Sequence, residues 1–144
     1  MPSMLPQDCL RAYRNNSVLT ASPGQLVLML YDGALRSLES AMEGFGRPSN
    51  DWRRIDVISS GLLKAQAILR ELRSNLDHEA GGEFTKSLDQ LYDYYLRRLE
   101  EASLRMDVKG VEEVQRLLKD LRDGWAEMLT KGQPSAPAGM RPPA

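Results

Sequence analysis

The sequence predicts an all-α protein, an antiparallel four-helix bundle with a short N-terminal helix or strap and a disordered C-terminal tail. Three observations predict this fold class. Apolar residues recur every three or four positions along four long segments, which is the spacing of one helix face. None of these segments shows the strict alternation of a half-buried strand. Short stretches rich in Gly, Pro, Asn and Asp separate the segments and are typical of turns.

The first helix is expected over residues 23–45. Ser22 is a suitable N-cap, Pro23 fits the first helical position, and Gln25 completes a Ser-x-x-Gln capping box. The apolar residues of this segment step by four and three, as an amphipathic helix requires. They are Val27, Tyr31, Ala34, Leu38, Ala41 and Phe45.

Gly33 lies inside this first helix, where a glycine costs about 1 kcal/mol relative to alanine. We hypothesise that it makes room for a close helix–helix contact, under the N-terminal segment. The neighbouring Tyr31 would then supply a ring to the interior and Asp32 a carboxylate for hydrogen bonding. Under this hypothesis Gly33 is structural. Gly33→Leu would then overpack the site and lower the free energy of unfolding by several kcal/mol, roughly the upper end of measured overpacking effects.

Three more helices follow, over residues 51–76, 82–105 and 108–131. Asn50 or Asp51 is the expected cap of the second helix, and Asp107 of the fourth. A Gly-Gly pair at 81–82 breaks the chain before the third helix, and Gly132 followed by Pro134 ends the fourth. Because the connections are short, consecutive helices are expected to run antiparallel.

The chain therefore divides into an N-terminal strap or short helix (1–19), the bundle (20–131) and a tail (132–144). The tail holds four of the eight prolines and one charge. A segment of this composition cannot bury a core, so disorder is expected.

Composition and motifs exclude several function classes. The 144 residues carry a net charge of −1, which gives no electrostatic reason to expect nucleic-acid binding. No apolar run approaches the roughly 18 residues of a membrane span, and the N-terminus does not resemble a secretory signal. We therefore expect a cytoplasmic protein without membrane insertion.

No catalytic constellation is present in the sequence. The one histidine, His78, lies between two acidic residues in a predicted turn, and the one cysteine, Cys9, has no histidine close in sequence and follows the acidic Asp8. The Glu-x-x-His pairs of di-iron bundles and the phosphate-binding and nucleophile motifs are missing. We therefore predict a protein that is not an enzyme and that needs no metal or cofactor.

The helices carry more apolar surface than an inner stripe requires. Leu63 and Ile68 widen the stripe of the second helix, and Leu91, Tyr94 and Leu96 that of the third. This surplus fits a groove that binds an amphipathic helix of another protein. It also fits a generous core with a homodimer face, and both alternatives stay open at this point.

Several segments resemble the flagellin-specific secretion chaperones of the bacterial flagellar export system. The resemblance is carried first by residues 12–14 (AYR), 18–23 (VLTASP) and 29–34 (MLYDGA). It continues through Leu76-Asp77, Gly81-Gly82 and Leu88-x-x-Leu-Tyr-Asp-Tyr94, and closes with Leu117-Leu118-x-x-Leu121-Arg122-Asp123-x-Trp125. It covers about residues 10–130 in the order and spacing of the family.

The resemblance implies a small cytoplasmic bundle that binds the C-terminal region of newly made flagellin. That client segment is disordered in free flagellin and forms amphipathic helices when the filament polymerises. The chaperone wraps it along apolar grooves, blocks premature assembly and aids delivery to the export gate, without nucleotide or metal.

The resemblance also implies a client-binding surface and an N-terminal segment that covers part of it. Combined with the helical spacing, the expected client contacts are Ile55, Ile58, Leu62, Leu69, Tyr92, Tyr95, Leu99, Val114, Leu118 and Trp125. Leu10 and Tyr13 would cover part of the groove when no client is bound. They fit equally a fixed cap on one end of the bundle.

Overall fold

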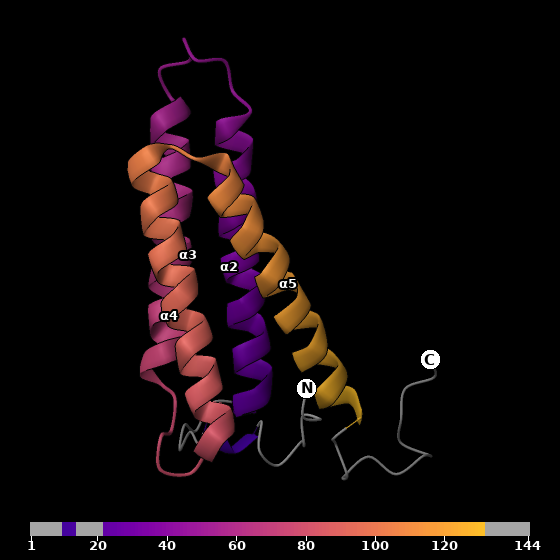
Figure 1. The fold of residues 1–144 in the computed structure, drawn as a ribbon. Helices are drawn as coiled ribbons and strands as arrows, with labels where there is room; N and C mark the ends of the chain where they lie inside the picture. Colours follow the sequence, from indigo (N-terminus) through magenta and orange to yellow (C-terminus); the bar gives the residue numbers. More distant parts are fainter. Residues whose placement is uncertain (1–9, 14–21, 132–144) are drawn as a thin grey trace, which may run out of the picture.

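The computed structural model describes residues 10–13 and 22–131, and these form an all-α bundle (Figure 1). Its four helices are α2 (Pro23–Phe45), α3 (Arg54–Ser74), α4 (Gly82–Arg105) and α5 (Val108–Lys131). Consecutive helices run antiparallel, and the ring of contacts closes where α5 packs on α2. The predicted fold class is confirmed. The whole predicted tail and most of the predicted strap lie outside the described residues, so that division of the chain stays a prediction.

Local sequence explains where the helices begin and end. At the start of α2 the Ser22 Oγ accepts a hydrogen bond from the Gln25 backbone N–H at 3.1 Å, and the Gln25 side chain accepts one from the Ser22 N–H at 3.3 Å. This completes the predicted capping box, with Pro23 in the first turn. Asp107 accepts from the Lys109 N–H at 3.0 Å before α5, after a turn in which Met106 is left-handed.

The predicted bounds of α3 are wrong at both ends. The helix begins at Arg54, with Arg53 at the N-cap, and ends at Ser74. Asp51 does supply a hydrogen-bond acceptor, but to the Arg53 N–H at 2.9 Å, which stabilises a turn that precedes the helix. Leu76, predicted inside this helix, lies beyond it and is still buried.

The apolar residues at three- and four-residue spacing meet in one core. Tyr31, Leu38, Leu69, Tyr92 and Trp125 are among its fully buried side chains. In the described part of the chain every buried side-chain nitrogen or oxygen has a hydrogen-bond partner. No described helix is long and apolar enough to span a bilayer.

Two glycines let α2 and α3 approach at backbone distance. A Cβ added to Gly61 would lie 2.7 Å from the Ser37 carbonyl oxygen and 2.8 Å from the Ala41 nitrogen. A Cβ added to Gly44 would lie 3.0 Å from the Ile58 nitrogen. Carbon atoms in real proteins do not approach so closely, so only glycine permits this spacing of the two helices.

Gly33 is not one of these close-approach positions, and the hypothesis that it makes room for another helix is wrong. An added Cβ there would first meet the Ile68 Cδ1 at 3.4 Å and the Arg36 side chain at 3.7 Å, which are ordinary contacts. The first atom of a larger side chain at Gly33 would therefore displace no backbone atom of another helix. Its neighbours do behave as expected, because Tyr31 is buried and the Asp32 carboxylate accepts from the Arg122 Nε at 2.7 Å.

Candidate functional site

The structure places nine of the ten predicted client-binding residues in the core. Ile58, Leu62, Leu69, Tyr92, Tyr95, Leu99, Val114, Leu118 and Trp125 are at most 2% exposed, whereas Ile55 is 60% exposed. The regular spacing that selected the nine is the spacing of the inward face of each helix, which explains their burial. A helix lying on this bundle would reach only Ile55 among the ten. The client-binding role of the set stays a prediction.

Residues 10–13 lie at the end of the bundle where α2 begins and α5 ends. Tyr13 is buried and reaches two helices at once. Its hydroxyl donates to the Tyr92 hydroxyl on α4 at 2.7 Å, and its ring lies edge-on to the Trp125 ring on α5, with centroids 5.8 Å apart. Tyr13 thus joins α4 to α5 at the end of the bundle toward which these helices diverge (Figure 1).

The backbone of the N-terminal segment is tied down as well. The Asp77 N–H, in the connection between α3 and α4, donates to the Ala12 carbonyl at 2.8 Å. Leu10 is 42% exposed, and its Cδ2 lies 3.2 Å from where a Cβ on Gly24 would stand. Within residues 10–13, the buried Tyr13 side chain and the hydrogen bond to the Ala12 carbonyl thus hold the segment, while Leu10 stays half open to solvent.

The buried hydroxyls continue inward from Tyr13. The Tyr92 hydroxyl also lies 2.6 Å from the Tyr31 hydroxyl, and the Trp125 Nε1–H donates to the Gly24 carbonyl at 2.8 Å. Burial raises the pKa of both Tyr13 and Tyr92, because the phenolate would lose its hydration. These side chains are therefore neutral hydrogen-bonding groups at any physiological pH.

Raised tyrosine pKa values predict that alkali destabilises the bundle. Below the unfolded-state pKa of about 10 both states keep these protons, so the contribution to stability is complete. Above it the unfolded chain ionises while Tyr13 and Tyr92 stay protonated, and the free energy of unfolding falls by about 1.4 kcal/mol per pH unit for each such group. Urea unfolding followed by circular dichroism at pH 9 and pH 11 measures this. Tyr92→Phe should show a shallower pH dependence, and a slope equal to that of the parent would contradict the assignment.

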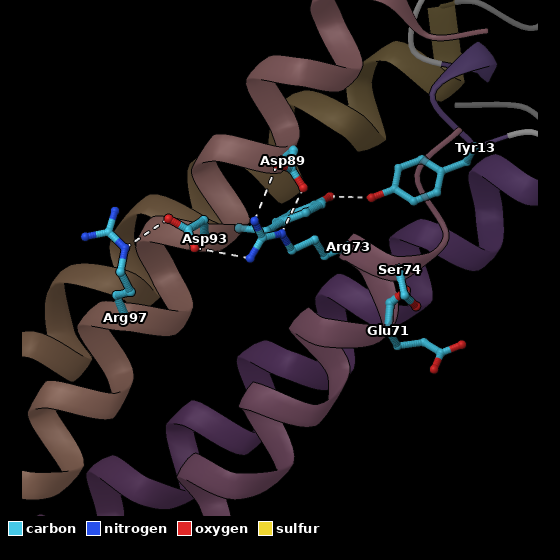
Figure 2. A network of polar contacts seen from close by, with 8 residues as sticks. Tyr13, Glu71, Arg73, Ser74, Asp89, Asp93 and Arg97 are labelled. Carbon is cyan, nitrogen blue, oxygen red and sulfur yellow. Dashed lines mark hydrogen bonds and ion pairs between the residues drawn. The ribbon is translucent and has the colours of Figure 1, made fainter. Parts of the chain in front are cut away.

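Three of the four helix seams carry ion pairs on their outer side. Arg73 on α3 donates to Asp89 at 2.8 Å and to Asp93 at 3.1 Å on α4, and Asp93 also accepts from Arg97 (Figure 2). The Arg98–Glu113 pair at 2.7 Å joins α4 to α5, and the Arg122–Asp32 pair at 2.7 Å joins α5 to α2. Within the described residues, no ion pair joins α2 to α3.

The seam without ion pairs carries an apolar hollow of about 600 Å³, which we call the α2–α3 groove. Its wall residues come from the first half of α2 and the second half of α3, and Tyr13 closes one end. The apolar side chains that line it include Leu26, Met29, Leu30, Ile68 and Leu72. Met29 is 60% exposed. This groove is the candidate site.

Sequence reasoning did not assign the α2 wall of this groove. Leu26, Met29 and Leu30 lie beside the seam residues Val27 and Tyr31, so the regular apolar stripe does not include them. The signal that could have found them is the unbroken apolar run at 26–31, which is wider than an inward stripe needs. Ile68, on the facing wall, was recognised as surplus apolar surface.

The described residues hold no group of three or more His, Cys, Asp or Glu side chains that could bind a metal ion. An all-α bundle with an apolar groove between two helices is typical of proteins that bind a helix of a partner. Comparison with known proteins assigns the chain to a family. Residues 7–132 match the family model described as "Flagellar protein FliS", and the chain belongs to this family.

Named relatives agree with the family match. The chain is 36% identical to the flagellar secretion chaperone FliS of Bacillus subtilis over 126 residues, covering 88% of this chain and 90% of the relative. It is 39% identical to FliS of Salmonella typhimurium over 119 residues (81% and 83% covered) and 41% identical to FliS of Escherichia coli over 115 residues (79% and 81% covered). The predicted resemblance is confirmed. These relatives are named as chaperones, a non-enzymatic class, so the prediction that the chain is not an enzyme is also confirmed. The family also supports a role in flagellar export.

Proposed function

We propose that this chain is a cytoplasmic export chaperone that binds the disordered C-terminal region of flagellin and carries it to the export gate. The observation that supports the proposal is the α2–α3 groove, an apolar hollow between two helices that no ion pair joins among the described residues. Its occupant is an amphipathic helix of the client, whose apolar face replaces water on Met29, Leu30 and Ile68. While the client is bound there, its helix is withheld from polymerisation.

The energetics of this proposal follow from coupled folding and binding. A disordered client loses chain entropy as it folds on the groove. Burial of apolar area offsets this cost at about 25 cal/mol per Å². Binding should therefore show a large negative heat-capacity change. Tyr13 lies at one end of the groove, so a client that extends past this end meets the N-terminal segment, with Leu10 and Tyr13 as the covering residues.

Calorimetric titration with the C-terminal segment of flagellin from the same organism tests the proposal. We expect saturable one-to-one binding, and Met29→Lys should weaken it by about tenfold or more because a charge then enters the apolar interface. Leu104→Lys is the matched control, because Leu104 is 81% exposed on α4 and lies away from the groove. Binding that the two variants weaken equally would place the client elsewhere. Failure of the parent to bind, together with a stable dimer in sedimentation, would favour a homodimeric bundle instead.

A further inference from the structure

The α2–α3 groove continues beyond Ile68 into a second hollow of about 710 Å³. Gly33, Arg36 and Ile68 line both hollows, so they meet at these three residues. The second hollow runs toward the connection between α2 and α3, where Trp52, 80% exposed, forms its far wall. We call this second hollow the extension.

Gly33 stands at the junction of the groove and the extension. No side chain projects from this position, and the nearest neighbour that an added Cβ would meet is the tip of Ile68. A larger residue would stand between the two hollows. Gly33 thus leaves the junction open, although a glycine inside a helix costs some stability. This is a physical role other than helix packing.

The extension differs from the groove in charge. Arg36, Arg53 and Lys64 line it against one carboxylate, that of Asp56. Elsewhere on the bundle Arg47, Arg73, Arg98 and Arg122 are held in ion pairs at 3.3 Å or less. In the part of the chain that the structure describes, neither Arg36 nor Lys64 has such a partner. Arg53 stacks on the Trp52 ring at 5.4 Å and lies 3.8 Å from Asp51.

The opposite end of the α2–α3 surface has the opposite charge. Glu71 lines the groove near Tyr13 and points away from the Arg73 cluster (Figure 2). The α2–α3 surface is therefore polarised, with Glu71 in the groove and an excess of cations over the single Asp56 carboxylate in the extension. Charge complementarity of this kind favours one partner and one docking direction.

We propose that the extension binds an acidic stretch of the helix that occupies the groove, so that the client docks in one direction. This inference rests on the proposed function in taking the client's helix as the occupant. From Pro23 to Ser40, the span of α2 that lines the two hollows, an α-helix extends about 26 Å. The bound helix presents its apolar residues to Met29 and Ile68. Two or three turns further along, it presents carboxylates to Arg36, Lys64 and Arg53. Trp52 offers an aromatic face at the end of the site, the side-chain type that anchors many protein interfaces.

Two synthetic helical peptides test the charge of the occupant. They share an apolar half, and their other half carries either glutamates or lysines. We expect the parent protein to bind the glutamate peptide about tenfold more tightly at low salt, with the preference shrinking as salt screens the charges. Equal affinities for the two peptides at low salt would overturn the proposal.

Charge reversal in the protein identifies the residues responsible. Arg36→Glu with Lys64→Glu should invert the preference toward the lysine peptide, and Arg36→Gln with Lys64→Gln should abolish it. All four side chains changed here and in the control are exposed, so circular dichroism should report a folded bundle. Lys86→Glu with Arg105→Glu on α4 is the control of equal charge change, and it should keep the parent's preference. If the control pair shifts the preference as much, the effect is one of net charge and the proposal fails.

The flagellin segment separates this inference from the proposed function. Binding that Met29→Lys weakens but Arg36→Glu with Lys64→Glu leaves unchanged would overturn the acidic extension and leave the client groove standing. Absence of flagellin binding, with the peptide preference and its inversion intact, would overturn the proposed client and leave the extension as a site for another acidic helix.

Discussion

Gly61→Val is expected to destabilise the bundle by about 3 kcal/mol, at the upper end of overpacking effects. The Cβ would stand 2.7 Å from the Ser37 carbonyl oxygen and 2.8 Å from the Ala41 nitrogen. Both are backbone atoms of α2, so no side chain can turn aside to relieve the clash. The two helices would have to separate along their shared seam. Urea unfolding followed by circular dichroism measures the loss.

Gly124→Ala is the matched control for this prediction. Gly124 lies inside α5, and an added Cβ would meet nothing within 4 Å. Alanine should therefore stabilise the helix by about 0.5–1 kcal/mol through its higher helix propensity. If Gly61→Val were as stable as the parent, α2 and α3 could not be packed at backbone distance.

Trp125→Ala should cost about 3–5 kcal/mol, the range for removing a large aromatic side chain from a core. The side chain is fully buried. Its ring lies edge-on to Tyr13 and Tyr31, and its Nε1–H satisfies the Gly24 carbonyl. The variant would leave a cavity, would lose this hydrogen bond and would loosen the N-terminal segment. Urea unfolding again gives the magnitude.

Trp52→Ala provides the contrast, because the chain has two tryptophans and this one is 80% exposed. Its replacement should change the free energy of unfolding by no more than about 0.5 kcal/mol. A loss at Trp125 as small as that at Trp52 would mean that Trp125 is not part of the core. It would then return to the set of accessible client contacts.

Helix positions were predictable because apolar spacing and caps agree along the chain. Three helices have the predicted bounds. Their first turns lie at Ser22, Gly82 and Asp107, and tertiary contacts do not shift these helix starts. The start of α3 was not predictable, because Asp51 satisfies the N–H of Arg53 within a turn. A sequence pattern does not separate this turn from a first helical turn.

The candidate site was less accessible to sequence reasoning than the fold. Regular spacing selects inward-facing residues such as Leu69 and Tyr92, which the bundle buries within itself. The groove is made by residues next to that stripe, such as Met29 and Leu30, and by the absence of a side chain at Gly33. Some surplus apolar residues stay uncovered because no ion pair lies over them. The position of the ion pairs depends in turn on how neighbouring helices are rotated relative to one another.

The order of contacts around the bundle has a kinetic consequence. α2 packs on α3, α3 on α4 and α4 on α5, so most contacts between helices join segments that are near in the chain, and the α2–α5 pairing is the main contact between distant helices. Helical proteins with such local contacts fold in microseconds to milliseconds. A ribosome adds about 5–20 residues per second, so synthesis of the chain takes many times longer than its folding. We infer that folding keeps pace with synthesis, so that this protein is competent almost as soon as it leaves the ribosome, and stopped-flow refolding slower than about one second would contradict this.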